Sequence, residues 1–148
     1  MNKIVIIGCG NVGMSYAYAL VNQKCPVDEL VLIDKNHNKA EGEAMDLNHS
    51  IPYSPNNIII KAGNYSDCKN AKIVMIAAGA NQNTGETRLD LISKNLDIFK
   101  NIIKQVMNTK FNGIFLIATN PVDVMSYITY KYSKLPASKI VGTGTSLD

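Results

Sequence analysis

Six short apolar runs recur along the chain, and segments with helical spacing separate most of them. The runs are continuously apolar and several are rich in Ile and Val, which is typical of strands covered on both faces, as in a parallel sheet. We expect strands at Lys3–Gly8, Leu30–Asp34, Asn57–Lys61, Ile73–Ala77, Ile114–Thr119 and Lys139–Gly142.

The segments between these runs predict helices at Asn11–Gln23, Asn38–Asn48, Glu86–Thr109 and Val122–Tyr132. Residues 62–72 are too few for a full helix, so a loop with at most a short turn is expected there. The longest helix should cover the sheet with an apolar stripe made of Leu89, Ile92, Leu96, Phe99, Ile103 and Val106. Alternating strands and helices predict an α/β fold, a doubly wound six-stranded parallel sheet of the Rossmann type.

Composition narrows the function classes. A chain of 148 residues has the length of one domain, so we expect a single dinucleotide-binding domain over residues 1–148, without a second catalytic domain. The net charge of +3 comes from dispersed lysines, which argues against a nucleic-acid partner, and no apolar run approaches the roughly 20 residues that span a membrane. The three scattered cysteines predict free thiols and no metal site, and the missing leader favours the cytoplasm.

A glycine pattern follows the first predicted strand. Gly8, Gly10 and Gly13 form G-x-G-x-x-G at the start of a predicted helix, and Asp34 ends the next strand. The glycines allow a tight turn, a close approach of backbone to a pyrophosphate, and close packing of helix on sheet. The aspartate can bind both ribose hydroxyls of an adenosine and repel the 2′-phosphate of NADP, so NAD is the expected cofactor. Asp34 could instead be an ordinary solvated residue or helix cap.

Two polar segments at the ends of later strands are candidates for substrate contacts. The loop from Ala78 to Leu91 runs from the fourth strand into the long helix, where a loop can close over a ligand. Arg88 lies near the positive end of that helix, where a cation is disfavoured unless it serves an anion or pairs with Glu86 or Asp90. The segment 118–123 could be a simple strand-to-helix turn, with Asn120 as the cap and Pro121 as the first helical residue.

Together, in this order and spacing, these segments resemble the L-lactate dehydrogenase family of the bacterial type. The most specific stretches are AGANQ at 78–82, GETRLDL at 85–91, ATNPVD at 118–123 and GTSLD at 144–148. The resemblance implies that Gln82 contacts the small side of the substrate, that Arg88 polarises its carbonyl, and that Asn120 binds nicotinamide and substrate. It also implies a cis Asn120–Pro121 peptide. Further positions that it assigns to NAD are Val12, Lys39, Tyr65, Gly79, Ala80, Ala118, Thr119 and Thr143.

The chemistry implied by the family is hydride transfer that interconverts (S)-lactate and pyruvate, with a small-molecule substrate and a homo-oligomer, a tetramer in the family. Asp148 stands where the family has the carboxylate that orients its catalytic histidine, and Arg88 would stabilise the negative carbonyl oxygen. His37 and His49 do not match the catalytic position, which lies beyond residue 148. We therefore expect this chain alone to bind NAD without reducing pyruvate.

Two alternatives remain open from the sequence. Malate dehydrogenase of the same superfamily has an arginine where Gln82 stands, and a neutral amide cannot pair with a second carboxylate, so lactate is favoured. The chain could also be a stand-alone NAD-binding module without catalysis.

Overall fold

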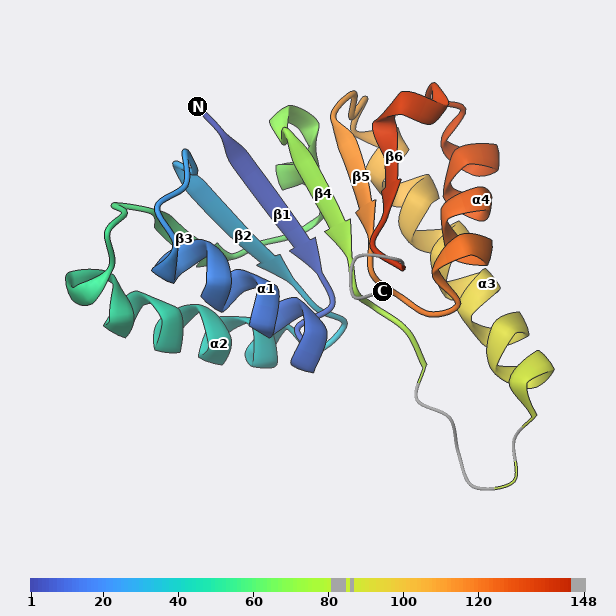
Figure 1. The fold of residues 1–148 in the computed structure, drawn as a ribbon, viewed down its shortest axis with the longest axis horizontal. Helices are drawn as coiled ribbons and strands as arrows, with labels where there is room; N and C mark the ends of the chain where they lie inside the picture. Colours follow the sequence, from blue (N-terminus) through green and yellow to red (C-terminus); the bar gives the residue numbers. More distant parts are fainter. Residues whose placement is uncertain (81–84, 86, 145–148) are drawn as a thin grey trace.

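The computed structural model describes residues 1–80, 85 and 87–144 (Figure 1). Its core is a six-stranded parallel sheet in the order β3-β2-β1-β4-β5-β6. The strand order reverses beside β1, so the chain winds outward in both directions from the middle of the sheet. The strands are β1 (Lys3–Ile7), β2 (Glu29–Ile33), β3 (Ile59–Ala62), β4 (Ile73–Ile76), β5 (Ile114–Ile117) and β6 (Ile140–Gly142).

In the described part of the chain, four α-helices and three short 3-10 turns connect these strands. The α-helices are α1 (Asn11–Asn22), α2 (His37–Ser50), α3 (Arg88–Asn108) and α4 (Val122–Ser133). The 3-10 turns are η1 (Ile51–Tyr53), η2 (Tyr65–Asn70) and η3 (Ala137–Lys139). Within the described residues, no helix combines the length and apolar character needed to cross a bilayer.

Alternate residues of the central strands point to opposite faces, and each face has its own core. Val5 is aligned with Val31 of β2 and Val74 of β4, and all three contribute to a core that includes Phe99 of α3 and Met125 of α4. The other face packs Ile4, Ile6, Leu30 and Leu32 against buried residues of α1 and α2. The sheet is therefore covered on both sides, which explains why its strands are continuously apolar.

These observations confirm the predicted fold class, with shifts at the ends of elements. The strand predicted from Asn57 begins at Ile59, after a bend at residues 54–56, and residues 62–72 contain η2. The apolar stripe of α3 begins later than predicted, because Leu89 in the first turn is 75% exposed while Phe99, Ile103 and Val106 are buried. The predicted start at Glu86 was also early, since Thr87 is the N-cap and accepts a hydrogen bond from the backbone of Asp90.

The candidate residues lie at one edge of the sheet, where the parallel strands have their carboxyl ends. Gly8 follows β1, Asp34 follows β2, Ala77–Ala80 follow β4, and Thr119 and Asn120 lie after β5. Figure 1 shows that the strand arrows point to the edge at which α1, α3 and α4 begin. Ligands of doubly wound sheets bind at this edge, beside the reversal of strand order.

Candidate dinucleotide site

A cleft of about 860 Å³ lies at the carboxyl ends of β1, β2 and β4. Its volume is in the range of small-molecule and cofactor sites. Eight of the residues assigned to the cofactor from the sequence line it: Gly8, Gly10, Val12, Asp34, Lys39, Tyr65, Gly79 and Ala80. They come from four separate segments, and the fold brings them around one space.

The glycine loop has the geometry that its sequence predicts. Gly8 has a φ of +105°, and a Cβ there would lie 2.5 Å from the backbone nitrogen of Ala78. A Cβ at Gly13 would collide with the carbonyl oxygen of Gly8, so Gly13 supports the loop from beneath without lining the cleft. A Cβ at Gly10, in contrast, would meet no atom within 4 Å, which leaves open space on the cleft side of the loop. A phosphate group fits there.

The N-terminus of α1 adds a positive electrostatic end to this space. Gly10 is the N-cap, and the first turn contains no acidic residue. The free N–H groups and the helix dipole therefore remain available to an anion. The dinucleotide expected from the sequence fits this part of the cleft.

Asp34 lines the same cleft directly beside the glycine loop and is held by backbone groups. Its Oδ2 accepts a 2.8 Å hydrogen bond from the Cys9 N–H, and its Oδ1 accepts a 2.9 Å bond from the Asn36 N–H. Each carboxylate oxygen has a second lone pair, so these contacts leave acceptor capacity for ribose hydroxyls. Asn36 is also the N-cap of α2, where its side chain accepts from the Lys39 N–H at 3.3 Å.

Burial raises the pKa of two groups beside the cleft. Desolvation, followed by the nearby charges of Asp34 and Glu43, raises the pKa of the Cys9 thiol to about 12. Desolvation is also the main reason that the pKa of the Tyr65 phenol is raised, with Cys68 contributing. At neutral pH the phenol is therefore a neutral hydrogen-bond donor.

The loops after β4 and β5 are joined through Thr119. Its hydroxyl donates a 2.8 Å hydrogen bond to the carbonyl of Ala78, and the side chain is buried. Ala118 packs against the core on the α1 and α2 face, and the Thr143 N–H donates to the Ile117 carbonyl at 3.0 Å. These three residues border the carboxyl edge from β5 and β6, outside the lining of the cleft itself.

Asn120 is exposed, and its peptide bond to Pro121 is cis. The cis bond agrees with the expectation drawn from the family. The alternative in which Asn120 caps α4 is wrong, because Pro121 is the N-cap and no side chain caps the helix. The Asn120 side chain makes no hydrogen bond within the described part of the chain and is available to a ligand.

The candidate substrate-binding residue Gln82 and the candidate catalytic residue Asp148 lie outside the described residues. Arg88 is the first residue of α3, while its side chain lies outside the described part of the chain. The capping box between Thr87 and Asp90 fixes the start of the helix on which Arg88 stands.

Sequence reasoning missed part of the cleft wall. Ile98, Asn101 and Ile102 of α3 line it beside Tyr65. Their spacing of three and four residues was a usable signal for one helix face, but it competed with the stronger apolar stripe. Asn95, a buried amide one turn earlier on the same helix, was also missed, although a polar residue within an apolar stripe is unusual.

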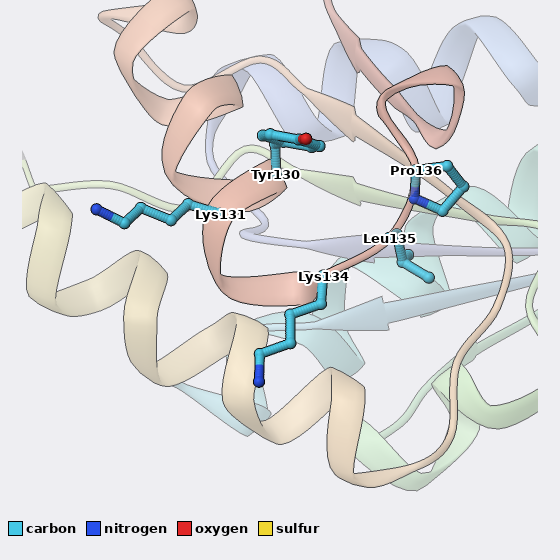
Figure 2. Close-up of a pocket in the computed structure, with 5 residues that line it drawn as sticks. All are labelled: Tyr130, Lys131, Lys134, Leu135 and Pro136. Carbon is cyan, nitrogen blue, oxygen red and sulfur yellow. The ribbon is translucent and has the colours of Figure 1, made fainter.

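A second hollow of about 560 Å³ lies at the other end of α4, lined by Tyr130, Lys131, Lys134, Leu135 and Pro136 (Figure 2). The ammonium groups of Lys131 and Lys134 extend in different directions, so they do not converge on one ligand. The hollow contains none of the residues singled out from the sequence, and it lies at the amino-terminal edge of the sheet. The cleft at the carboxyl edge is therefore the better functional candidate.

The amino-acid sequence is similar to a known family of NAD-binding domains, in agreement with the geometry of the cleft. Residues 2–142 match the family described as lactate/malate dehydrogenase, NAD binding domain. The chain is 58% identical over 147 residues to L-lactate dehydrogenase 1 of Staphylococcus aureus, covering 99% of this chain and 46% of that protein. It thus spans about half the length of the curated relatives it matches.

Solved structures show the same fold. The minor L-lactate dehydrogenase of Enterococcus mundtii in its ligands-bound form has a TM-score of 0.96 at 49% identity, over 99% of this chain and 46% of that one. The malate dehydrogenase of Archaeoglobus fulgidus in complex with NADH has a TM-score of 0.88 at 37% identity, over 95% and 48%. The chain therefore belongs to the family of lactate/malate dehydrogenase NAD-binding domains.

Proposed function

We propose that residues 1–148 form one dinucleotide-binding domain and contribute the cofactor half of an NAD-dependent L-lactate dehydrogenase. The observation that carries the proposal is the position of the Asp34 carboxylate, held by the Cys9 N–H beside the free start of α1. This arrangement suits an adenosine ribose on Asp34 and the neighbouring phosphates at the start of the helix. Bound NAD would supply hydride acceptance, and its reduced form hydride donation.

The chain's own residues would bind and orient this cofactor. The glycine loop would hold the pyrophosphate through backbone N–H groups, and Asp34 would accept hydrogen bonds from ribose hydroxyls. Tyr65, Lys39 and Val12 line the cleft where the adenosine half would lie. Gly79, Ala80, Ala118, Thr119 and Thr143 would border the rest of the dinucleotide.

The substrate assignment rests on three side chains. Asn120 would bind the substrate and nicotinamide, Arg88 would stabilise negative charge on the substrate oxygen, and Gln82 would contact the small side of the substrate. The uncharged Gln82 favours pyruvate and lactate over a dicarboxylic acid. Asp148 would orient a histidine contributed by the other half of the enzyme.

Further expectations belong to the same proposal. A homo-oligomer, a tetramer in the family, and a cytoplasmic, glycolytic role in pyruvate fermentation are proposed for the enzyme that contains this domain. Malate dehydrogenase remains the second candidate activity, favoured by the likeness to the Archaeoglobus enzyme. A stand-alone NAD-binding module is the non-catalytic alternative.

The proposal is tested by NADH binding and pyruvate-dependent loss of NADH absorbance, measured on this chain and on a chain that also carries the other half of the relatives' length. The short chain should bind NADH and turn over far more slowly than about 1 s⁻¹, because proton transfer by a positioned acid contributes about 10²–10⁴-fold. The long chain should reduce pyruvate. Failure of the short chain to bind NADH, or turnover by it at about 1 s⁻¹ or faster, would contradict the division of labour proposed here.

A further inference from the structure

Asn95 is a buried amide on the face of α3 that covers the sheet. Its side chain is 2% exposed, and it stands one turn before Phe99, which is part of the core. A buried amide without hydrogen bonds costs folding free energy, so such a residue is retained in an apolar environment when its polar atoms are satisfied. The partners of Asn95 therefore indicate its role.

The two ends of this amide bind two different loops. Oδ1 accepts a 2.8 Å hydrogen bond from the Ala80 N–H, after β4, and Nδ2 donates at 3.3 Å to the Asn120 carbonyl, after β5. The backbone partners fix the orientation of the amide, because an N–H can only donate and a carbonyl can only accept. One side chain thus ties together two loops that are 40 residues apart in sequence, from 80 to 120.

The surrounding packing leaves little freedom for this connection. A Cβ at Gly79 would lie 3.4 Å from the Asn95 Oδ1 and 2.9 Å from the Thr119 Cγ2. Thr119 in turn donates to the Ala78 carbonyl at 2.8 Å. The loop after β4 is therefore held at Ala78 by Thr119 and at Ala80 by Asn95.

We propose that Asn95 is a positioning residue that sets the Ala80 backbone and the Asn120 side chain relative to each other at the nicotinamide end of the cleft. This inference rests on the proposed function, which puts both residues beside the nicotinamide. Restraining the Asn120 carbonyl restrains the backbone from which its exposed side chain projects. Asn95 itself is buried beneath the loops and acts only through them.

The test compares two ligands that share the adenosine and phosphate groups. NADH and ADP-ribose are titrated against this chain and against Asn95→Leu, which removes both hydrogen bonds, and Asn95→Asp, which keeps the acceptor for Ala80 and loses the donor to Asn120. Thr129→Val is the matched control, because Thr129 is fully buried and its hydroxyl donates to Met125 within α4, away from the cleft. Thermal unfolding is recorded for every variant.

The wild-type chain should bind NADH more tightly than ADP-ribose. Asn95→Leu and Asn95→Asp should lower this preference by about tenfold while ADP-ribose affinity stays within about twofold, since a lost orientation affects only the nicotinamide end. Thr129→Val should leave the preference unchanged even where it lowers the melting temperature. If Asn95 had a merely structural role, its variants would lower the affinities for NADH and ADP-ribose equally or would change neither affinity. That result would overturn the inference.

A second test uses hydrogen exchange on the wild-type chain alone. Hydrogen exchange of the Ala80 N–H should slow more with NADH than with ADP-ribose, because the nicotinamide would lie against the loop that Asn95 holds. Equal protection by the two ligands, or equal affinity for them, would overturn the inference while leaving the dinucleotide site intact. Failure of both ligands to bind would overturn the proposed function itself.

Discussion

The backbone N–H of Cys9 donates a 2.8 Å hydrogen bond to Oδ2 of Asp34, joining the glycine loop after β1 to the end of β2. The Asn36 N–H holds the other carboxylate oxygen, so the negative charge has a fixed position in the lining of the cleft. The selectivity of the cleft for NAD over NADP should therefore depend on this one side chain.

Asp34→Ala should weaken NAD binding by about 100-fold or more, because both ribose hydroxyls lose an acceptor and hydrogen bonds to a charged group contribute about 1.5–3 kcal/mol each. NADP binding should weaken less, since the repulsion of its 2′-phosphate is removed at the same time. Titration calorimetry with NAD and with NADP measures the difference between the two affinities. Asp46→Ala, at an exposed position of α2 outside the cleft, is a control for the change in net charge. An unchanged preference in Asp34→Ala would show that Asp34 does not face the ribose.

Two glycine substitutions should separate binding from folding. Gly10→Ala places its Cβ in open space, so stability should change by about 1 kcal/mol or less while NADH affinity falls at least about tenfold, because the methyl group occupies the space proposed for a phosphate. Gly13→Ala collides with the Gly8 carbonyl oxygen and should destabilise the fold by about 1–3 kcal/mol. Chemical unfolding measures the stability of each variant, and fluorescence titration measures its NADH affinity. Equal effects of both variants on stability would contradict these roles.

Cys25 should react with a thiol reagent well before Cys9 and Cys68. Cys25 is partly exposed, whereas Cys9 and Cys68 are buried, and desolvation raises the pKa of each buried thiol to about 12. At pH 8 only about one such thiol in 10⁴ is ionised, and the thiolate is the reactive form. Peptide mapping after brief alkylation checks the order. Early labelling of Cys9 would mean that the glycine loop opens readily.

The same two thiols should make stability depend on alkaline pH. Their pKa is about 12 in the folded chain and 9.0 for an ordinary thiol, so the unfolded chain loses these protons first. The free energy of unfolding should therefore fall as pH rises from about 9 toward 12. Replacing Cys9 and Cys68 with Ala should make this dependence less steep in chemical denaturation, with the raised pKa of the Tyr65 phenol accounting for part of what remains. An equally steep curve would assign the dependence to other groups.

Gln82→Arg should shift substrate preference from pyruvate toward oxaloacetate in a chain that includes the other half of the enzyme. The guanidinium would pair with the second carboxylate, which the amide cannot do. The ratio of kcat/KM for the two acids is the measured quantity, and Gln82→Asn serves as the uncharged control. A ratio unchanged by the arginine would mean that Gln82 does not contact the substrate.

The sequence predicted the sheet well because its central strands β1, β2 and β4 are buried on both faces and carry an unbroken apolar signal. The sequence also predicted that the glycine loop and Asp34 meet at one cleft, because glycines suit a tight turn and Asp34 ends the neighbouring strand. The contribution of α3 to the cleft was harder to predict, because the spacing of Ile98, Asn101 and Ile102 indicates one helix face but not that this face meets Tyr65, which follows from tertiary packing. The bridge from Asn95 to Ala80 and Asn120 is likewise a property of tertiary packing.

Mapping of the NADH site on this chain by amide chemical shifts tests the central claim most directly. Addition of NADH should shift the backbone signals of the glycine loop, of Asp34 to Lys39, and of Ala77 to Ala80, because these segments surround the cleft at the carboxyl ends of the strands. ADP-ribose should reproduce the shifts at Asp34 and the glycine loop. Saturable shifts confined to Tyr130–Pro136 at the opposite edge, or no saturable shifts at all, would contradict the assignment of the cleft as the dinucleotide site.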